Sequence, residues 1–302
     1  MVIETENITK YYGQKLGCKD ISISVRKGEI FGFLGPNGAG KSTFIKIMTG
    51  LLFATSGTAT ILGKPLNDIS VRKRIGFLPE NFKYGEWMTG EDLLSFHASL
   101  YKLDKKNVKD RMKEVLSLVK LTGHEKYKLG TYSKGMQQRL GLASALLPDP
   151  DLLFLDEPTS ALDPIGRKEV RDIMTDLKSR GKTILLNSHL LSEVEMVCDS
   201  VVIINKGTVV VQGDMQELLK GEEVLHIHAE DLSNEVIEML KKIDSKMVSE
   251  NGRISLKINS REDVHNAASI IINGRGKLYG LKTQGTNLES KFISLIEGGD
   301  GK

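Results

Sequence analysis

One short glycine-rich segment limits what this chain can fold into more than any other part of its sequence. It follows the apolar run Ile30–Leu34 and opens the amphipathic stretch Thr43–Met48, which is the strand, loop and helix order of a phosphate-binding loop. Glycines let backbone N–H groups converge on an anion, and the following helix adds unpaired N–H groups at its start. The segment therefore predicts a nucleoside triphosphate site. Its residues are Gly35, Pro36, Asn37, Gly38, Ala39, Gly40, Lys41, Ser42 and Thr43.

An acidic pair, Asp156-Glu157, directly follows a fully apolar run that is typical of a parallel strand covered on both faces. A carboxylate at a strand end beside a phosphate loop can hold Mg²⁺, so Asp156 and the Ser42 hydroxyl are predicted metal ligands. Glu157 can polarise the water that attacks the γ-phosphorus. Lys41 supplies a positive charge for the β- and γ-phosphates. The sequence thus predicts nucleotide hydrolysis as well as binding.

The composition is that of an ordinary soluble protein, with 40% hydrophobic and 27% charged residues and a net charge of +3. This charge is too small to indicate a nucleic-acid partner. Cys18 and Cys198 cannot form a disulfide framework and are predicted to be small buried hydrophobic residues. No apolar run approaches the roughly 18–20 residues that span a bilayer, and the N-terminus lacks a signal-peptide pattern. Action at a membrane would therefore require a partner.

The order of predicted elements indicates an α/β core with a helical insertion. Short β segments are predicted over residues 2–35, and a further strand over Thr58–Leu62 follows the helix of the phosphate loop. From Thr89 to Leu147 the apolar spacing becomes helical, and Thr89 with Asp92 resembles a capping box. Strands then alternate with helices again up to about Gly221.

Residues 222–302 predict a separate small α+β domain. They contain 13 acidic and 11 basic residues, a net charge of −2, whereas a nucleic-acid-binding tail should be basic. His226 and His228 share one face of a predicted strand, where they are either part of a metal site or ordinary histidines. The predicted elements are strands Val224–His228 and Arg253–Ile258 and helices Ser233–Ile243, Val264–Ile272 and Leu288–Ile296.

These motifs resemble those of the nucleotide-binding subunits of ABC transporters. Tyr132–Leu140 is similar to the signature segment of that family, Ser160–Asp163 to its D-loop, and Asn187-Ser188-His189 to the segment that ends in its switch histidine. Tyr12 lies where the family has an aromatic residue that stacks on adenine, and Tyr11 is the less favoured candidate. The resemblance covers roughly residues 1–221. It implies a P-loop core, an antiparallel β subdomain and a helical subdomain, about 89–147, that carries the signature.

The resemblance also implies a mechanism and partners. Two copies are expected to pack head to tail, with ATP between Gly35–Thr43 of one copy and the signature of the other. Ser133 and Gly135 would supply hydrogen-bond donors to the γ-phosphate, His189 would orient the water, and Glu157 would act as the base. Because the chain has one phosphate loop and one signature, it would supply half of such a dimer.

Three residues depart from the family pattern. Glu80 stands where the family usually has glutamine, and its carboxylate remains a suitable oxygen ligand for Mg²⁺. In the signature, Lys134 replaces a glycine and Met136 replaces a glutamine.

The segment Asn81–Met88, which contains Phe82, Tyr84 and the only tryptophan, Trp87, has two interpretations. It is either a socket for a short helix of the membrane subunit or packing between the core and the helical part.

The expected protein is thus the ATP-hydrolysing subunit of an exporter, bound to a separate transmembrane permease at the cytoplasmic face of the cell membrane. No nucleic-acid partner is expected. The alternative is a soluble ABC ATPase that acts mechanically on nucleic acid or the ribosome. The long heptad insertion or second ATPase unit of such proteins is missing from the sequence. A GTP switch is excluded, because Asn205-Lys206-Gly207-Thr208 lacks the aspartate that pairs with guanine.

Overall fold

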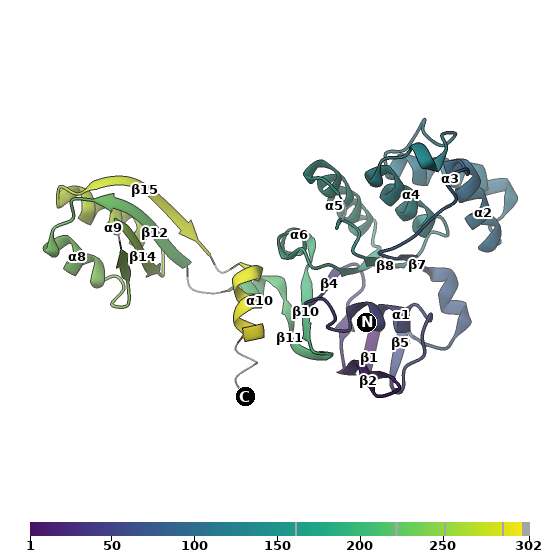
Figure 1. Ribbon diagram of the computed structural model, residues 1–302, viewed down its shortest axis with the longest axis horizontal. Coiled ribbons are helices and arrows are strands. Elements are labelled where there is room, and N and C mark those ends of the chain that lie inside the picture. The colour runs from purple at the N-terminus through teal and green to yellow at the C-terminus, as the bar shows by residue number, and fades with distance from the viewer. Residues whose placement is uncertain (161, 221–222, 251, 286, 298–302) are drawn as a thin grey trace. The chain divides into compact units, whose positions relative to one another are not determined.

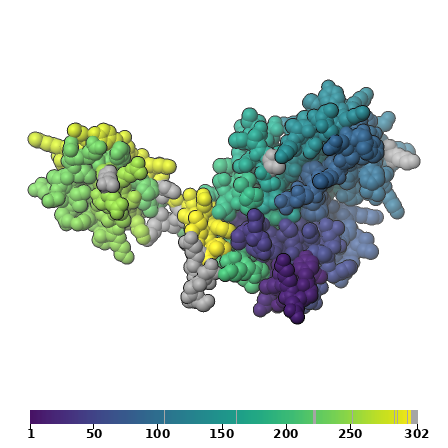
Figure 2. Space-filling view, in the orientation of Figure 1, coloured from purple at the N-terminus to yellow at the C-terminus, as the bar shows by residue number. Residues whose placement is uncertain are grey.

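The chain forms two compact units in a computed structural model that describes residues 1–160, 162–220, 223–250, 252–285 and 287–297. The first unit contains Met1–Met215 and the chain from Leu295 onward, and the second contains Gln216–Ser294. Their elements are labelled in Figure 1, and Figure 2 shows the surface of the same face, coloured by residue number. The domain division that the sequence predicts falls at residues 221 and 222, which lie outside the described residues, so it stays a prediction.

A six-stranded sheet positions the predicted site. Its order is β11-β10-β4-β9-β8-β7, and all neighbours are parallel except the pair β10 and β11. Every residue of β4, β8 and β9 is buried, as the apolar run before Asp156 predicted for β8. The carboxyl ends of the parallel strands meet at one edge, where α/β proteins bind their ligands. The strands are β4 (Ile30–Leu34), β7 (Ile75–Leu78), β8 (Leu152–Asp156), β9 (Thr183–Asn187), β10 (Ser200–Asn205) and β11 (Thr208–Asp214).

An antiparallel sheet forms the second layer of the first unit, in the order β2-β1-β5-β6 with β3 paired to β1. Helix α1 (Lys41–Met48) packs onto the same core, where the rings of Phe33 and Phe44 stack with centroids 4.7 Å apart. Cys18 and Cys198 are both buried, as predicted. The strands are β1 (Ile3–Tyr12), β2 (Lys15–Ile21), β3 (Ser24–Val25), β5 (Ser56–Ile61) and β6 (Lys64–Pro65).

The helical insertion consists of α2 (Gly90–Leu100), α3 (Lys105–Leu118) and α4 (Lys134–Leu146), which lie together in Figure 1. The predicted capping box is confirmed: the Asp92 amide donates to the Thr89 hydroxyl, and the Thr89 amide donates to the Asp92 carboxylate. The other helical segments of the first unit are η1 (Ile69–Arg74), η2 (Leu129–Thr131), α5 (Pro164–Ser179) and α6 (Leu191–Val197), and α7 (Met215–Leu219) crosses the division between the units. No helix among the described residues is long and apolar enough to span a membrane.

The second unit has the strand and helix order βαββαβ, with an antiparallel sheet in the order β13-β14-β12-β15. This is the split βαβ, or ferredoxin-like, arrangement. One sheet face packs on α8 and α9 through Leu225, Ile227, Val236 and Ile271. The predicted fold class is therefore confirmed, including the small α+β part. The elements are β12 (Glu223–Glu230), α8 (Asn234–Lys241), β13 (Val248–Glu250), β14 (Arg253–Ile258), α9 (Arg261–Asn273) and β15 (Lys277–Gln284), and α10 (Leu288–Glu297) crosses the division at Leu295.

His226 and His228 lie on the exposed face of β12. The Nδ1 atom of His226 lies 2.9 Å from the Ser255 hydroxyl, and the His228 ring contacts Tyr279. Within the described residues, no third His, Cys, Asp or Glu joins them in a group that could hold a metal ion. Both therefore have ordinary polar or aromatic partners.

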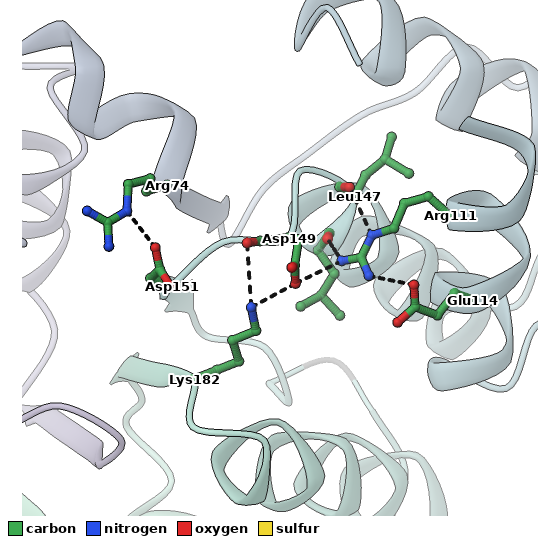
Figure 3. Close-up of polar contacts among 8 residues, drawn as sticks. Arg74, Arg111, Glu114, Leu147, Asp149, Asp151 and Lys182 are labelled. Carbon is green, nitrogen blue, oxygen red and sulfur yellow. Dashed lines mark hydrogen bonds and ion pairs between the residues drawn. The ribbon is translucent and has the colours of Figure 1, made fainter. Parts of the chain in front are cut away.

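The loop between α4 and β8 is held from two sides through Asp149 (Figure 3). Its carboxylate accepts from Lys182, which precedes β9, at 2.7 Å, and from Arg111 of α3 at 3.4 Å. The Arg111 guanidinium also donates to the Leu146 and Leu147 carbonyls at the end of α4. One carboxylate thus links the helical insertion to the central sheet, close to the strand that ends in Asp156.

We expect Asp149→Ala to lower the free energy of unfolding by about 1.5–3 kcal/mol. The change removes two partly exposed ion pairs worth about 0.2–1 kcal/mol each, and Asp149 has a left-handed φ of 55°, which alanine disfavours by about 1 kcal/mol. Asp149→Gly loses the same pairs without the backbone penalty, so it should lose less stability. Urea unfolding of the three proteins measures the difference, and equal losses in both variants would contradict the backbone argument.

The contribution of Asp149 should also depend on pH. Burial raises the pKa of its carboxyl group, but Lys182 and Arg111 more than offset this and leave the pKa below its ordinary value. A lowered pKa gives stability that is present above the unfolded-state value of about 3.9 and is lost as pH falls through the folded-state value. The stability difference between wild type and Asp149→Asn should therefore be constant near neutral pH and shrink in acid.

Candidate nucleotide site

The carboxyl edge of the central sheet brings the predicted nucleotide residues of the first unit around one cavity of about 650 Å³. Ten of its lining residues were predicted from the sequence, and Lys15, Leu16, Gly17 and Asn187 were not assigned a role there. Gly35, Pro36 and Ala39 of the loop and Asp156 at the end of β8 do not line it. The predicted residues on the cavity wall are Tyr12, Asn37, Gly38, Gly40, Lys41, Ser42, Thr43, Glu80, Glu157 and His189.

The phosphate loop needs glycine at two positions. Gly40 caps α1 with a φ of 99°, and a Cβ atom there would collide with the Gly17 carbonyl oxygen. A Cβ atom on Gly35 would collide with the Ile204 carbonyl oxygen. This close packing places the loop over the sheet edge and leaves the first amides of α1 without helical partners. The loop can therefore surround an anion, as its sequence predicts.

Lys41 is buried, with 6% of its surface exposed, and its ammonium donates to the Gly35 and Pro36 carbonyls at 2.8 and 3.2 Å. Burial lowers the pKa of Lys41, although Glu157, Asp156 and Glu80 act in the opposite direction. Carbonyl oxygens are weaker partners for an ammonium group than charged oxygens. The lysine is therefore ready to exchange its carbonyl contacts for phosphate oxygens.

Glu157 and His189 face each other across the ends of two neighbouring strands, with 2.8 Å between the glutamate Oε2 and the histidine Nδ1. Burial raises the pKa of Glu157, and His189 partly offsets the rise. Glu157 also has a left-handed φ of 53°, which is rare outside glycine and is tolerated mainly at functional sites. The pair combines a buried carboxylate and an imidazole at the wall of the cavity.

Asp156 is held by Asn187, whose side-chain amide donates to its Oδ1 atom. Burial raises the pKa of Asp156, and the Asn187 hydrogen bond acts against this rise. Asp156, the Glu80 carboxylate and the Ser42 hydroxyl are hard oxygen donors, the type that Mg²⁺ prefers, and two of the three line the cavity. The residues present therefore fit a magnesium ion.

Tyr12, rather than Tyr11, reaches the cavity. The residue is 46% exposed, its hydroxyl lies 3.4 Å from that of Thr43, and the Lys10 ammonium lies 5.5 Å from the ring centroid. A partly exposed aromatic face at the rim of a cavity is suitable for stacking a base.

The predicted signature donors do not line this cavity. Ser133 caps α4 by accepting from the Met136 amide at 3.2 Å, and both Ser133 and Lys134 are exposed. A Cβ atom on Gly135 would approach no atom closer than 3.8 Å, so space is open beside it. The first turn of α4 is thus an exposed set of donors. Ala161 of the predicted D-loop lies outside the described residues.

The aromatic segment 81–88 is divided between packing and exposure. Phe82 and Tyr84 are partly buried with ring centroids 5.1 Å apart, whereas Trp87 is 75% exposed.

A separate cavity of about 740 Å³ lies in the helical insertion, with Ala98, Met112 and Leu116 among its lining residues. Although it is larger than the nucleotide cavity, it contains none of the predicted nucleotide residues.

Comparisons of sequence and of structure both find proteins of ABC transporters. The sequence profile of a family described as ABC transporter matches residues 18–160. An uncharacterized ABC transporter ATP-binding protein of Nostoc sp. is 38% identical, over 98% of this chain and 90% of its own length. The bacitracin transport ATP-binding protein BcrA of Bacillus licheniformis is 36% identical, over 99% of this chain and 98% of its own. A solved ATP-binding subunit of an ABC transporter superposes with a TM-score of 0.66 at 31% identity, over 72% of this chain and 92% of its own.

Proposed function

The chain belongs to the ATP-binding subunits of ABC transporters, and from this membership we propose how its residues bind ATP, hydrolyse it and pass the energy to a membrane partner. The resemblance predicted from the motifs is thus confirmed, and the chain is an ATP hydrolase of this family. The proposal is carried by one observation: ten predicted residues from separate parts of the sequence line a single cavity.

The phosphates of ATP bind at the start of α1. The backbone amides of the loop and the helix N-terminus surround the β-phosphate, and Lys41 turns from its two carbonyl partners to the β- and γ-phosphates. Ser42, Asp156 and Glu80 would hold Mg²⁺, which when bound neutralises phosphate charge. Tyr12 stacks on the adenine at the rim.

Hydrolysis uses the pair at the ends of β8 and β9. Glu157 accepts a proton from the attacking water, and its raised pKa brings its basicity closer to what a general base needs near neutral pH. His189 lies 2.8 Å from Glu157, so its Nδ1 fixes the orientation of the carboxylate, and when both ring nitrogens carry a proton its Nε2 can donate to the γ-phosphate. Both groups are held on strand ends, which keeps their separation constant.

We expect Tyr12→Ala to weaken ATP binding about 10–100-fold, because stacking on an aromatic side chain is worth about 1–3 kcal/mol per base. Tyr12→Phe keeps the ring and should bind nearly as well as wild type. Titration with a fluorescent ATP analogue measures both. Tyr11→Ala is the matched control, since Tyr11 does not line the cavity; a larger loss in that variant would reverse the assignment.

Completion of the site requires a second copy of the chain. The exposed first turn of α4 offers the Ser133 hydroxyl and helix amides, which suit the γ-phosphate of ATP bound to another copy. ATP would then join two copies head to tail, and its hydrolysis would release them. This arrangement also explains why the signature residues do not line their own cavity.

The membrane partner would be a separate permease, and the cargo direction would be export. The similarity to a linearmycin resistance ATP-binding protein of Bacillus subtilis, over 97% of this chain, supports export, because export of a toxic compound confers resistance to it. The protein would then work peripherally at the cytoplasmic face of the cell membrane. Exposed Trp87, in the segment that follows Glu80, is the residue we assign to contact with the permease.

Affinity purification of the tagged chain from its native membrane tests this function. We expect a membrane protein to copurify with wild type and to be reduced with Trp87→Ala, while the exposed Tyr127→Ala control retains it. Recovery of ribosomes or nucleic acid in place of a membrane protein would overturn transport in favour of the soluble alternative.

A further inference from the structure

Asn187, the last residue of β9, connects the two carboxylates of the site. Its side-chain amide donates to Asp156, and its backbone carbonyl accepts from the Glu157 amide at 2.9 Å. The residue is 1% exposed and pairs in register with Asp156 on β8 and with Phe33 on β4. It is therefore fixed on both sides by the central sheet. A change in its side chain acts first on the carboxylate of Asp156, the predicted metal ligand.

The amide oxygen of the Asn187 side chain lacks a hydrogen-bond donor. The Oδ1 atom of Asn187 is buried and has no hydrogen-bond partner, one of two such side-chain atoms in the described residues. A buried acceptor without a donor is unfavourable, so the hydrogen bond to Asp156 alone does not explain an asparagine here. Because Asn187 lines the nucleotide cavity, its unpaired oxygen points to a donor that arrives when the site is loaded.

The chemistry of the loaded site identifies that donor. Phosphate oxygens are acceptors and cannot satisfy an amide oxygen. Lys41 donates to the Gly35 and Pro36 carbonyls, and under the proposed function it turns to the phosphates. The remaining donor is water held by Mg²⁺, because this ion keeps several of its waters when it binds to carboxylates and phosphates.

We propose that Asn187 is a positioning residue of the magnesium site: its amide nitrogen aims Asp156 at the metal, and its amide oxygen accepts a hydrogen bond from a metal-bound water. This inference rests on the proposed function, since it assumes that ATP and Mg²⁺ bind in this cavity. Partners that orient metal ligands from behind typically change metal affinity by about 10–100-fold when they are removed.

The test compares Asn187→Leu, which keeps the size of the side chain but removes both polar atoms, with wild type. A fluorescent ATP analogue is titrated in EDTA and then with Mg²⁺, and Mn²⁺ binding to the ATP-loaded protein is followed by electron paramagnetic resonance. We expect metal-free nucleotide binding within about twofold of wild type and metal affinity about 10–100-fold weaker. Thr183→Val is the control, because it removes a buried hydroxyl at the other end of β9.

The outcomes separate the inference from the proposed function. Unchanged metal affinity in Asn187→Leu would leave Asn187 a structural residue and overturn the inference alone. Absence of any metal effect on ATP binding in wild type would instead overturn the proposed function. If Asn187→Leu does not fold, Asn187→Asp decides, because it places a second carboxylate beside Asp156. Its melting temperature should fall in EDTA and then rise by more than that of wild type when Mg²⁺ and ATP are added, whereas a purely structural role predicts the same rise in both proteins.

Discussion

Glu157→Gln should lower ATP turnover by about 10²–10⁴-fold, the usual contribution of a positioned general base. The amide keeps the size of the carboxylate and its contact with His189, but it cannot accept the proton of the attacking water. Because ATP binding does not use this proton transfer, ATP should still bind. The variant should therefore accumulate in the ATP-bound state that wild type passes through.

In the head-to-tail arrangement, that accumulated state is a dimer. Size-exclusion chromatography of Glu157→Gln with ATP and Mg²⁺ should show a species of twice the mass of the chain, and ADP should not produce it. Glu217→Gln, an exposed glutamate of α7, is the matched control and should turn over ATP like wild type. A Glu157→Gln protein that stays monomeric with ATP would contradict its assignment as the base of a composite site.

The sequence predicts the first unit well because its signals are local. The runs that became β4, β8 and β9 are buried in full, so their apolar character identifies them without any tertiary information. The residues that follow such parallel strands share one edge of the sheet, which is why motifs far apart in sequence meet in one cavity. The Thr89–Asp92 capping box is similarly a local hydrogen-bond pattern.

The features that the sequence did not predict depend on contacts between distant segments. Strand β15 (Lys277–Gln284) has no clear alternation of apolar and polar residues, because it is a largely exposed edge strand interrupted by Gly280. In the sequence, Asn187 is only the first residue of the segment that ends in His189. Its contact with the Asp156 carboxylate is visible only in the structure. Likewise, the partners of Asp149 lie 38 and 33 residues away along the chain.

Gly135→Asp should abolish ATP-dependent dimerisation while leaving ATP binding to the single chain unchanged. The added side chain meets no atom closer than 3.8 Å at its Cβ, and an acidic residue in the first turn of α4 favours the helix, so the variant should fold. Its carboxylate would face the γ-phosphate of the other copy. At about 5 Å and an effective dielectric constant of about 20, each pair of like charges costs about 3 kcal/mol, or roughly a hundredfold in affinity.

Gly135→Asn is the control that separates charge from size, because it adds the same volume without the negative charge. In the Glu157→Gln background, the asparagine variant should retain most of the ATP-bound dimer and the aspartate variant should lose it. Both should bind a fluorescent ATP analogue as tightly as the parent, since Gly135 does not line the cavity of its own chain. A loss of ATP binding by monomeric Gly135→Asp would place the signature in the same site as the phosphate loop of its own chain, and so contradict the composite site.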